Sequence, residues 1–365
     1  MAGVYISYPF CGQKCTYCNF ASGVFPRSLL DSYLTALRAE IEGFQWQWRP
    51  ETLYIGGGTP SNLLEDELEG LLSPVPGKPW IEATIEAAPG TVTPSRAARW
   101  RSLGLNRASL GVQSFVSGEL ARTGRRHEAE TVLREVAILA RAGIRNFNVD
   151  LIAGLPGQTP ESWTESLDWI ERLEAPHVSV YMLEVDEDSR LGSEILHGGP
   201  RYGAGDVPPE ETIVELYEMA VERLARMGLA RYEISNFARP GYESRHNLKY
   251  WRLEPYAGFG ADAHSFDGVT RSQNVESPAE YVARFERGES PRSDAQPARI
   301  SEERFFVGLR LSQGMRPRPD EWRRFEAPIR RFLDAGLLET DGEMLRLTAK
   351  GVLLSNEVFQ EFIDI

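Results

Sequence analysis

The sequence is poor in cysteine, in positive charge and in long apolar runs, and each of these shortages argues against one class of protein. Three cysteines among 365 residues are an odd number, so a disulfide framework fits badly. Acidic residues outnumber basic ones and give a formal net charge of −13, which argues against general nucleic-acid binding because that binding relies on a basic surface. No apolar run approaches the roughly 18 residues that a membrane-spanning helix needs.

The composition is otherwise that of a globular protein, with 42% hydrophobic and 25% charged residues. The chain enters an apolar, strand-like segment at Val4 with no basic leader before it, so we expect a cytoplasmic protein. A reducing compartment also suits free thiolates. The length exceeds one ordinary domain, and it fits a barrel of about 200 to 250 residues followed by a smaller domain.

Strand-like runs alternate with helical stretches over the first two-thirds of the chain. The runs are 4–7, 52–55, 81–85, 107–110, 146–152 and 178–182. Thr-Pro pairs at 59, 93 and 159 predict helix starts, because threonine caps free backbone donors and proline suits the first helical position. Strands that alternate with helices indicate parallel βα units. We therefore predict an α/β fold, a partial parallel (β/α)6 TIM-like barrel whose site loops follow the strand carboxyl ends.

The pattern changes after residue 185. We expect a loop over 192–209, a helix over 210–227, a short strand over 230–234 and a loop-rich segment over 236–268. Helices over 302–311, 329–335 and 348–358, with a hairpin of 337–340 and 344–347, indicate a winged-helix-type appendage that packs rather than binds DNA. The predicted domains are a barrel core (1–185), an extension and linker (186–300), and a mainly helical, winged-helix-like domain (301–365).

All three cysteines, Cys11, Cys15 and Cys18, lie in one segment with Cys-x3-Cys-x2-Cys spacing. Structural zinc normally needs four nitrogen or sulfur ligands, and the nearest histidine in sequence is His127, so zinc would need a remote fourth ligand. Three thiolates on one loop can instead hold three corners of an iron–sulfur cube, which normally takes four protein thiolates. Inert packing remains the other alternative. An iron without a protein ligand would be open to a small molecule.

Other polar residues stand at the ends of the predicted strands. The glycine run 56–58 follows the second strand, Glu86 and Asp150 end the third and fifth, and Gln113 follows the fourth, with Arg125 beyond it. Carboxylates can accept hydrogen bonds from ribose hydroxyls or an ammonium group, and an arginine can pair with a carboxylate through two bonds. Each residue alone could be a surface group or a cap, but the set suits a ligand that joins a nucleoside to an amino acid.

The segment His246-Asn247-Leu248-Lys249-Tyr250-Trp251 stands out among only five histidines. A neutral imidazole is a good iron ligand, and aromatic neighbours could shelter a porphyrin face. The alternative is a satisfied histidine within an aromatic cluster. His264, in Gly-Ala-Asp-Ala-His-Ser, is more ambiguous, and His127 fits a polar site residue or a cap. His177 and His197 carry no signal.

Taken together, these motifs resemble the radical S-adenosylmethionine (SAM) superfamily, whose signature has this cysteine spacing with an aromatic residue, here Tyr17, before the last cysteine. Within it the chain is similar to the group of the oxygen-independent coproporphyrinogen III oxidase (HemN) and the HemW-type heme chaperones, over nearly its whole length. The resemblance implies a [4Fe-4S] cluster on the three cysteines, SAM at the open iron and formation of a 5′-deoxyadenosyl radical. It implies SAM contacts at Tyr5, Tyr17, Gly57, Gly58, Thr59, Glu86, Gln113, Arg125 and Asp150.

Two departures from the oxidase favour the chaperone. Phe20 stands where the oxidase has a further cysteine, and the first cluster cysteine is already residue 11, where the oxidase carries a substantial preceding segment. The motif His-Asn-x-x-Tyr-Trp is similar to the HemW signature, which implies that His246 holds heme, with His264 as a weaker candidate. Ser7-Tyr8, Ala88 and Thr123 depart from the usual residues but remove no cluster ligand.

We therefore expect a heme chaperone that passes heme to an unidentified acceptor protein and carries a SAM-linked cluster. The alternative is an oxygen-independent oxidase that decarboxylates the propionates of coproporphyrinogen III. The resemblance leaves room for peripheral contact with membrane heme proteins, without a membrane span, and for a homodimer. No nucleic-acid partner is expected.

Overall fold

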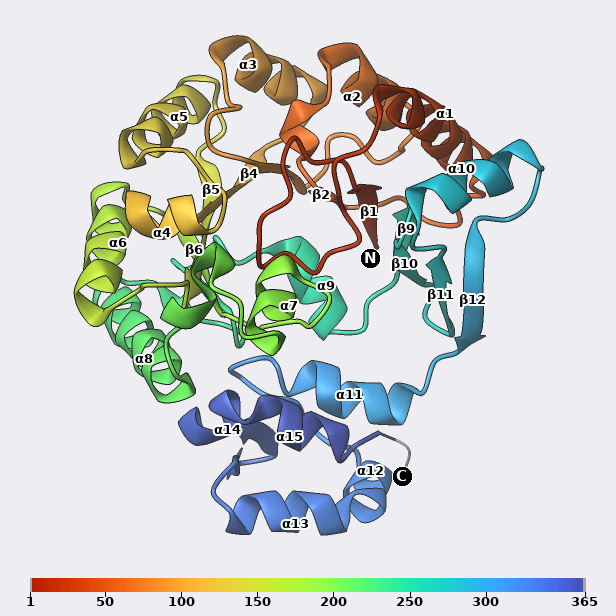
Figure 1. Cartoon of the computed structure of the whole chain (residues 1–365). Coiled ribbons are helices and arrows are strands. Elements are labelled where there is room, and N and C mark those ends of the chain that lie inside the picture. The colour runs from red at the N-terminus through yellow and green to blue at the C-terminus, as the bar shows by residue number, and fades with distance from the viewer. Residues whose placement is uncertain (1, 364–365) are drawn as a thin grey trace.

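Twelve strands form one sheet, and its central part is a partial barrel (Figure 1). In the computed structural model, which describes residues 2–363, six parallel strands pair in sequence order. They are β1 (Gly3–Tyr8), β2 (Thr52–Gly57), β3 (Glu82–Ala87), β4 (Arg107–Gln113), β5 (Asn146–Ala153) and β6 (His177–Met182). The outer neighbours of β1 and β6 are other strands, so the sheet is not closed into a ring. The predicted partial parallel barrel is confirmed.

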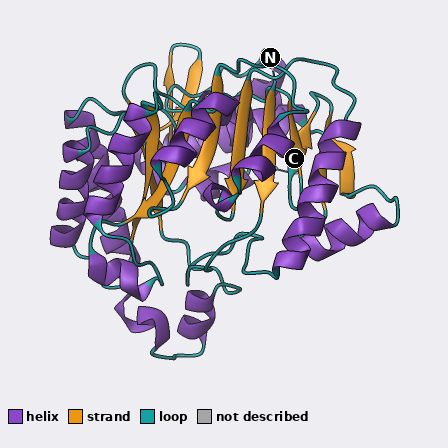
Figure 2. Ribbon diagram, turned by 90° about the horizontal axis from the view of Figure 1, so that it is seen from above, coloured by secondary structure: helices purple, strands orange, loops and turns teal. Residues whose placement is uncertain are grey.

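Helices cover the outside of this sheet, and Figure 2 shows the strands side by side with helices around them. Their bounds are α1 (Arg27–Gly43), η1 (Pro60–Asn62), α2 (Glu65–Leu72), α3 (Pro94–Leu103), α4 (Ser117–Arg122), α5 (Ala129–Arg141), α6 (Pro160–Arg172) and α8 (Glu210–Arg226). Thr93 and Thr159 cap α3 and α6 by accepting from backbone N–H groups three residues on, which confirms two of the Thr-Pro helix starts. Thr59 precedes only the three-residue η1 and makes no side-chain cap.

The inner face of the barrel is polar where β4, β5 and β6 meet. Asn148 donates from Nδ2 to the hydroxyl oxygens of Ser109 (2.7 Å) and Ser179 (3.0 Å), and its Oδ1 lies 2.6 Å from His177 Nδ1. Residues at alternate positions of a strand face the same side, so the outward-facing Val149 and Val178 join the apolar core under the helices. Buried polar groups are tolerated when they are hydrogen-bonded to one another, as here.

The segment from residue 183 to residue 297 contains more regular structure than the sequence predicts. The elements are α7 (Arg190–Leu196), η2 (Arg201–Asp206), β7 (Ala230–Arg231), β8 (Asn236–Ala238), α9 (Arg245–Trp251), β9 (Tyr256–Phe259), β10 (His264–Phe266), β11 (Thr270–Asn274), α10 (Pro278–Glu286) and β12 (Arg292–Pro297). The segment expected to be loop-rich, 236–268, also contains the short elements β8, α9, β9 and β10. Its strands have three or four residues, which is too short for a hydrophobic period to be recognised.

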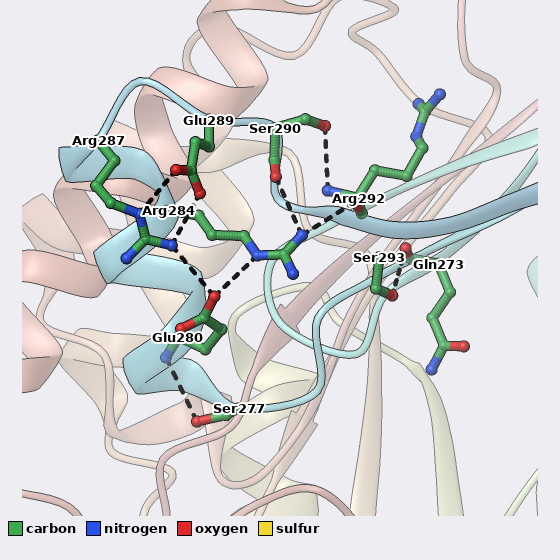
Figure 3. Close-up of polar contacts among 9 residues, drawn as sticks. All are labelled: Gln273, Ser277, Glu280, Arg284, Arg287, Glu289, Ser290, Arg292 and Ser293. Carbon is green, nitrogen blue, oxygen red and sulfur yellow. Dashed lines mark hydrogen bonds and ion pairs between the residues drawn. The ribbon is translucent and has the colours of Figure 1, made fainter.

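β9 extends the barrel sheet in parallel beside β1, and β10 to β12 continue it outward as antiparallel strands. The loop from α10 to β12 is tied by arginines (Figure 3). Arg284 donates to the carbonyl oxygens of Ser290 and Arg292, and both Arg284 and Arg287 pair with Glu280. These ion pairs are exposed, so they orient the edge of the sheet and contribute little to stability.

The C-terminal region is mainly helical, with α11 (Ile300–Gly308), α12 (Pro319–Arg324), α13 (Glu326–Asp334), α14 (Ala349–Leu353), α15 (Ser355–Gln360) and the hairpin of β13 (Leu338–Asp341) and β14 (Met344–Leu347). Phe305, Phe325 and Phe362 pack against one another at its centre. It contacts the rest of the chain through Arg310, whose guanidinium lies 4.4 Å from the Trp251 ring centroid. Within residues 2–363, no helix combines the length and apolarity required to cross a membrane.

Candidate functional site

The three cysteines lie on the loop between β1 and α1. The backbone of this loop is fixed by hydrogen bonds from Cys11 N to Gly23 O (2.8 Å) and from Cys18 N to Cys15 O (3.4 Å). All three thiols are free and partly exposed, and burial, together with the two neighbouring thiols, raises the pKa of Cys11. Within residues 2–363, no three Cys, His, Asp or Glu side chains are gathered closely enough to hold a metal ion. Thiol donors suit an iron–sulfur cluster. In this structure, however, the three sulfur atoms do not lie close enough together to hold one.

The glycine turn after β2 lies directly against the cysteine loop. Gly58 N donates to Tyr8 O (2.7 Å), and Thr59 N donates to Phe10 O (2.9 Å). A Cβ atom on Gly58 would stand 2.6 Å from Phe10 O, and Gly57 has a φ of +111°, which favours glycine. Glycine is therefore required here for the two backbones to approach. The predicted proximity of the glycine run and the cysteines holds in the structure.

Glu86 and Asp150 face the inside of the barrel near the carboxyl ends of β3 and β5. Glu86 accepts from the Tyr54 hydroxyl (2.8 Å) and from Gly57 N (3.0 Å). Burial raises the pKa of Glu86 to about 7, and the charge of Asp150 adds to the shift. Asp150 accepts from Asn148 Nδ2 (2.6 Å), and burial raises its pKa as well. Two desolvated carboxyl groups in one chamber are typical of a binding site for a cationic or hydroxyl-rich ligand.

Arg125 links the cysteine loop to the end of β4. Its Nη1 donates to Gly111 O (2.6 Å), and its Nε donates to the hydroxyl of Tyr17 (3.3 Å). Gln113 has a φ of +72°, which is uncommon outside glycine and costs about 1 kcal/mol or more. Strained residues of this kind concentrate at functional sites. Burial, followed by the charge of Arg125, lowers the pKa of His127 to about 4.

A column of stacked rings runs through the barrel below these residues. The ring of Tyr5 stacks on the ring of Tyr54 with 6.2 Å between their centroids, and the ring of Tyr54 stacks on that of His246 with 5.4 Å between centroids. Because the Tyr54 hydroxyl also donates to Glu86, this stack of rings helps to fix the position of the Glu86 carboxyl group. Tyr54 was missed at the sequence level; the only signal was its position on a strand whose glycine end had been singled out.

His246 lies at the opposite end of the strands from the cysteines. Its Nδ1 is 2.9 Å from Thr52 Oγ1, at the start of β2, and its Nε2 is 2.7 Å from the Tyr250 hydroxyl. The side chain is 1% exposed, and burial lowers its pKa to about 3. Helix α9 is held here because Glu82 accepts from the backbone N–H of His246 (2.9 Å). The assignment of heme to His246 stays a prediction, and coordination would require the imidazole to give up one of these two hydrogen bonds and to become accessible.

We expect His246→Ala to lower the free energy of unfolding by about 2 to 4 kcal/mol, because it leaves a cavity and removes the partner of the buried Thr52 hydroxyl and of the half-buried Tyr250 hydroxyl. Urea denaturation followed by circular dichroism measures this change. His197→Ala, at an exposed histidine, is the matched control and should shift stability by less than about 0.5 kcal/mol. An unchanged midpoint for His246→Ala would contradict the packing described here.

His264, in contrast, is exposed and lies at the cysteine end of the barrel. β9 runs parallel to β1, and β10 returns from its carboxyl end, which places His264 at that end of the sheet. Asp262, in the turn before it, has a φ of +59° and accepts from Gln273 Nε2 (2.9 Å). Its charge acts on the Tyr5 hydroxyl, whose pKa is raised chiefly by burial and also by Glu86. Asp262 is thus an acidic group near Tyr5 that the sequence pattern did not reveal.

The raised pKa of Glu86 predicts a pH dependence of stability. The folded chain binds this proton more tightly than the unfolded chain, so the contribution of Glu86 to stability is greatest below pH 4.5 and falls as the pH rises towards 7. At about 1.4 kcal/mol per pKa unit, the wild type should lose about 3 kcal/mol relative to Glu86→Gln between those pH values. Urea unfolding of both proteins across this range checks the prediction. Parallel stability profiles would show that Glu86 does not titrate as described.

Two family patterns match the sequence. The Radical SAM superfamily matches residues 5–170, and the HemN C-terminal domain matches residues 296–354. The heme chaperone HemW of Bacillus subtilis (strain 168) is 33% identical over 381 aligned residues, covering 100% of this chain and 99% of that protein. HemW of Mycobacterium tuberculosis (strain ATCC 25618 / H37Rv) is 34% identical, covering 99% of this chain and 94% of that one.

A solved structure has the same fold. The coproporphyrinogen III oxidase HemN from Escherichia coli, described as a radical SAM enzyme, superposes with a TM-score of 0.84. The match covers 100% of this chain and 90% of that one, at 21% sequence identity. At this identity the likeness establishes the architecture and leaves the chemistry open.

Proposed function

The chain belongs to the radical SAM superfamily and, within it, to the family of the HemW heme chaperones, and from this membership we propose that it binds heme and hands it to an acceptor protein. The observation that carries the proposal is the similarity to these chaperones from end to end. Phe20 supports it, because this residue is 68% exposed at a position where the related oxidase places a thiol. The phenylalanine side chain has no thiol, so it cannot replace the cysteine that the oxidase has at this position.

We further propose that Cys11, Cys15 and Cys18 hold a [4Fe-4S] cluster and that SAM binds beside it. When bound, this pair supplies one-electron chemistry that the amino acids lack. Glu86 and Asp150 are placed to accept from ammonium or ribose hydroxyl groups, and the Arg125 guanidinium can pair with a carboxylate. The remaining proposed SAM contacts are Tyr5, Tyr17, Gly57, Gly58, Thr59 and Gln113.

The domain bounds and the cellular location are also proposals. We keep a core over 1–185, an extension over 186–300 and a C-terminal domain over 301–365, with the qualification that strands β9 to β12 join the barrel sheet. The extension would then serve as one wall of the barrel. We propose that the protein works in the cytoplasm, where its thiols stay reduced.

Two assays on the anaerobically reconstituted full chain test the function. Heme titration should give saturable binding with a shift of the Soret band. Incubation with coproporphyrinogen III, SAM and a reductant should yield no protoporphyrinogen. Accumulation of protoporphyrinogen would identify an oxidase and overturn the chaperone proposal, and so would the absence of saturable heme binding.

A further inference from the structure

Apolar side chains gather at the mouth of the barrel, around the cysteine loop. Among residues 2–363, fourteen large hydrophobic side chains are exposed, and six of them fall within residues 20–25 and 185–196. We call this group the mouth surface; its members are Phe20, Val24, Phe25, Val185, Ile195 and Leu196. Single exposed apolar residues need no explanation, but a concentration at the rim of a site marks a binding surface.

Hydrogen bonds hold the two segments of the mouth surface together. Leu191 N donates to Thr16 O (2.8 Å), and Asn19 Nδ2 lies 3.5 Å from Asp186 Oδ2. In Figure 1 the loop that follows β1 and helix α7 meet at the centre of the view. Residues four apart share a helical face, so Ile195 and Leu196 continue the face that Leu191 and Gly192 bury. The last turn of α7 therefore leaves an apolar face uncovered, and Leu196 is 60% exposed.

His197 follows directly after α7, and its imidazole is placed to bind a metal from outside. Its Nδ1 lies 2.6 Å from Ser193 O, and because a carbonyl oxygen can only accept, Nδ1 carries the proton. With Nδ1 donating to this carbonyl, Nε2 is the ring nitrogen placed to bind a metal, and the side chain is exposed. Histidines that bind metals usually donate their other ring N–H in this way, which fixes the tautomer. By comparison, both ring nitrogens of His177 and of His246 are already engaged.

Two cations beside the mouth surface have no acidic partner within residues 2–363. Lys14 Nζ donates to Phe20 O (3.2 Å), and Arg190 Nη2 donates to Lys14 O (2.6 Å). Neither forms an ion pair there, whereas Asp186 is engaged by Asn19 and by the backbone N–H of Asp188. Heme combines an apolar ring, a metal that accepts imidazole and two carboxylates. The mouth surface, His197 and these cations complement its three parts.

We propose that heme docks on the mouth surface with His197 Nε2 as an iron ligand and its propionates towards Lys14 and Arg190. The inference rests on the proposed function and identifies its binding site. It places the heme beside the cysteine loop, on an imidazole that is already exposed. It also gives Phe20 a role, as an aromatic contact for the porphyrin face.

Heme titrations of the full chain, followed by absorption spectroscopy, test this assignment. We expect His197→Ala to raise the Kd for heme at least tenfold and to remove the absorption bands of imidazole-ligated heme. His197→Met should restore a spectrum of ligated heme with shifted bands, because thioether sulfur replaces imidazole nitrogen on the iron; a structural role of the histidine would not produce this shift. Leu196→Glu should weaken binding about tenfold, whereas Val269→Glu, at another exposed apolar residue remote in sequence, should bind as the wild type does.

The outcomes separate the site from the function. Saturable binding by the wild type together with unchanged affinity and spectrum in His197→Ala would overturn the site and leave the chaperone proposal standing. Loss of the spectrum in His264→Ala, with His197→Ala unaffected, would overturn it in favour of His264. Failure of the wild type to bind heme at all would remove the proposed function, and the site with it.

Discussion

Replacing Cys15 with serine is expected to remove the iron–sulfur cluster from the anaerobically reconstituted chain. The sequence contains only three cysteines, so no other thiol can take the place of the lost one. Iron and sulfide should fall from about four of each per chain to near zero, and the visible absorbance should disappear with them. Chemical analysis of iron and sulfide, with the absorption spectrum, measures the effect.

The control for this experiment is Asn19→Ala, an exposed change in the same loop, which should keep its iron, its sulfide and its absorbance. Survival of the visible band in Cys15→Ser would contradict the proposed ligand set. Loss of the band in both variants would point to disturbance of the loop rather than loss of a ligand, and the cysteine assignment would lose its support.

Gly58→Ala is expected to damage the site without touching a proposed cluster ligand. The added Cβ would stand 2.6 Å from the carbonyl oxygen of Phe10 and 2.9 Å from its nitrogen, so the backbone leading into Cys11 must move. Overpacking of this kind typically costs about 1 to 3 kcal/mol. We expect the affinity for SAM to fall at least tenfold, measured by equilibrium dialysis of reconstituted protein.

The matched control is Gly43→Ala, because no atom lies within 4 Å of the added Cβ and the residue has an ordinary backbone conformation. It should bind SAM as the wild type does. Wild-type affinity in Gly58→Ala would show that the contact between the glycine turn and the cysteine loop does not shape the site.

The barrel could be predicted because its signals are local and repeated. Apolar runs of four to seven residues, separated by helical periods and by Thr-Pro starts at Thr93 and Thr159, placed all six parallel strands within three residues of their observed bounds. The three- and four-residue strands β8 to β10 carry no such period, so the sequence predicts only a loop-rich segment over 236–268. The helix expected over 348–358 divides into α14 and α15 at Leu354, where ψ reaches 29°.

The sequence predicts only those parts of the site that follow from the rule that site residues lie at the carboxyl ends of parallel strands. Parallel strands end together, so Glu86, Gln113 and Asp150 could be assigned to one edge from their positions alone. Which side chains meet inside the barrel depends on register and packing, so the support of Glu86 by Tyr54 had no sequence signal. The location of His246 also depends on packing. The His-Asn-x-x-Tyr-Trp motif does not indicate which end of the barrel its helix covers.

His197 shows the converse. It belongs to no recognisable motif, and only the fold reveals that it follows a helix whose first turn contacts the cysteine loop and that its ring is exposed. Sequence patterns identify residues that chemistry restricts to a few types and spacings. A surface assembled from a loop near residue 20 and a helix near residue 195 becomes visible only when the two segments are seen in contact.

The most direct test of this account is electron paramagnetic resonance of the reduced, reconstituted protein with and without SAM. A cluster held by only three thiolates leaves one iron for SAM, so we predict about four irons per chain and a signal that changes when SAM is added. Zinc in place of iron, or an iron–sulfur signal that SAM leaves unaltered, would contradict the account.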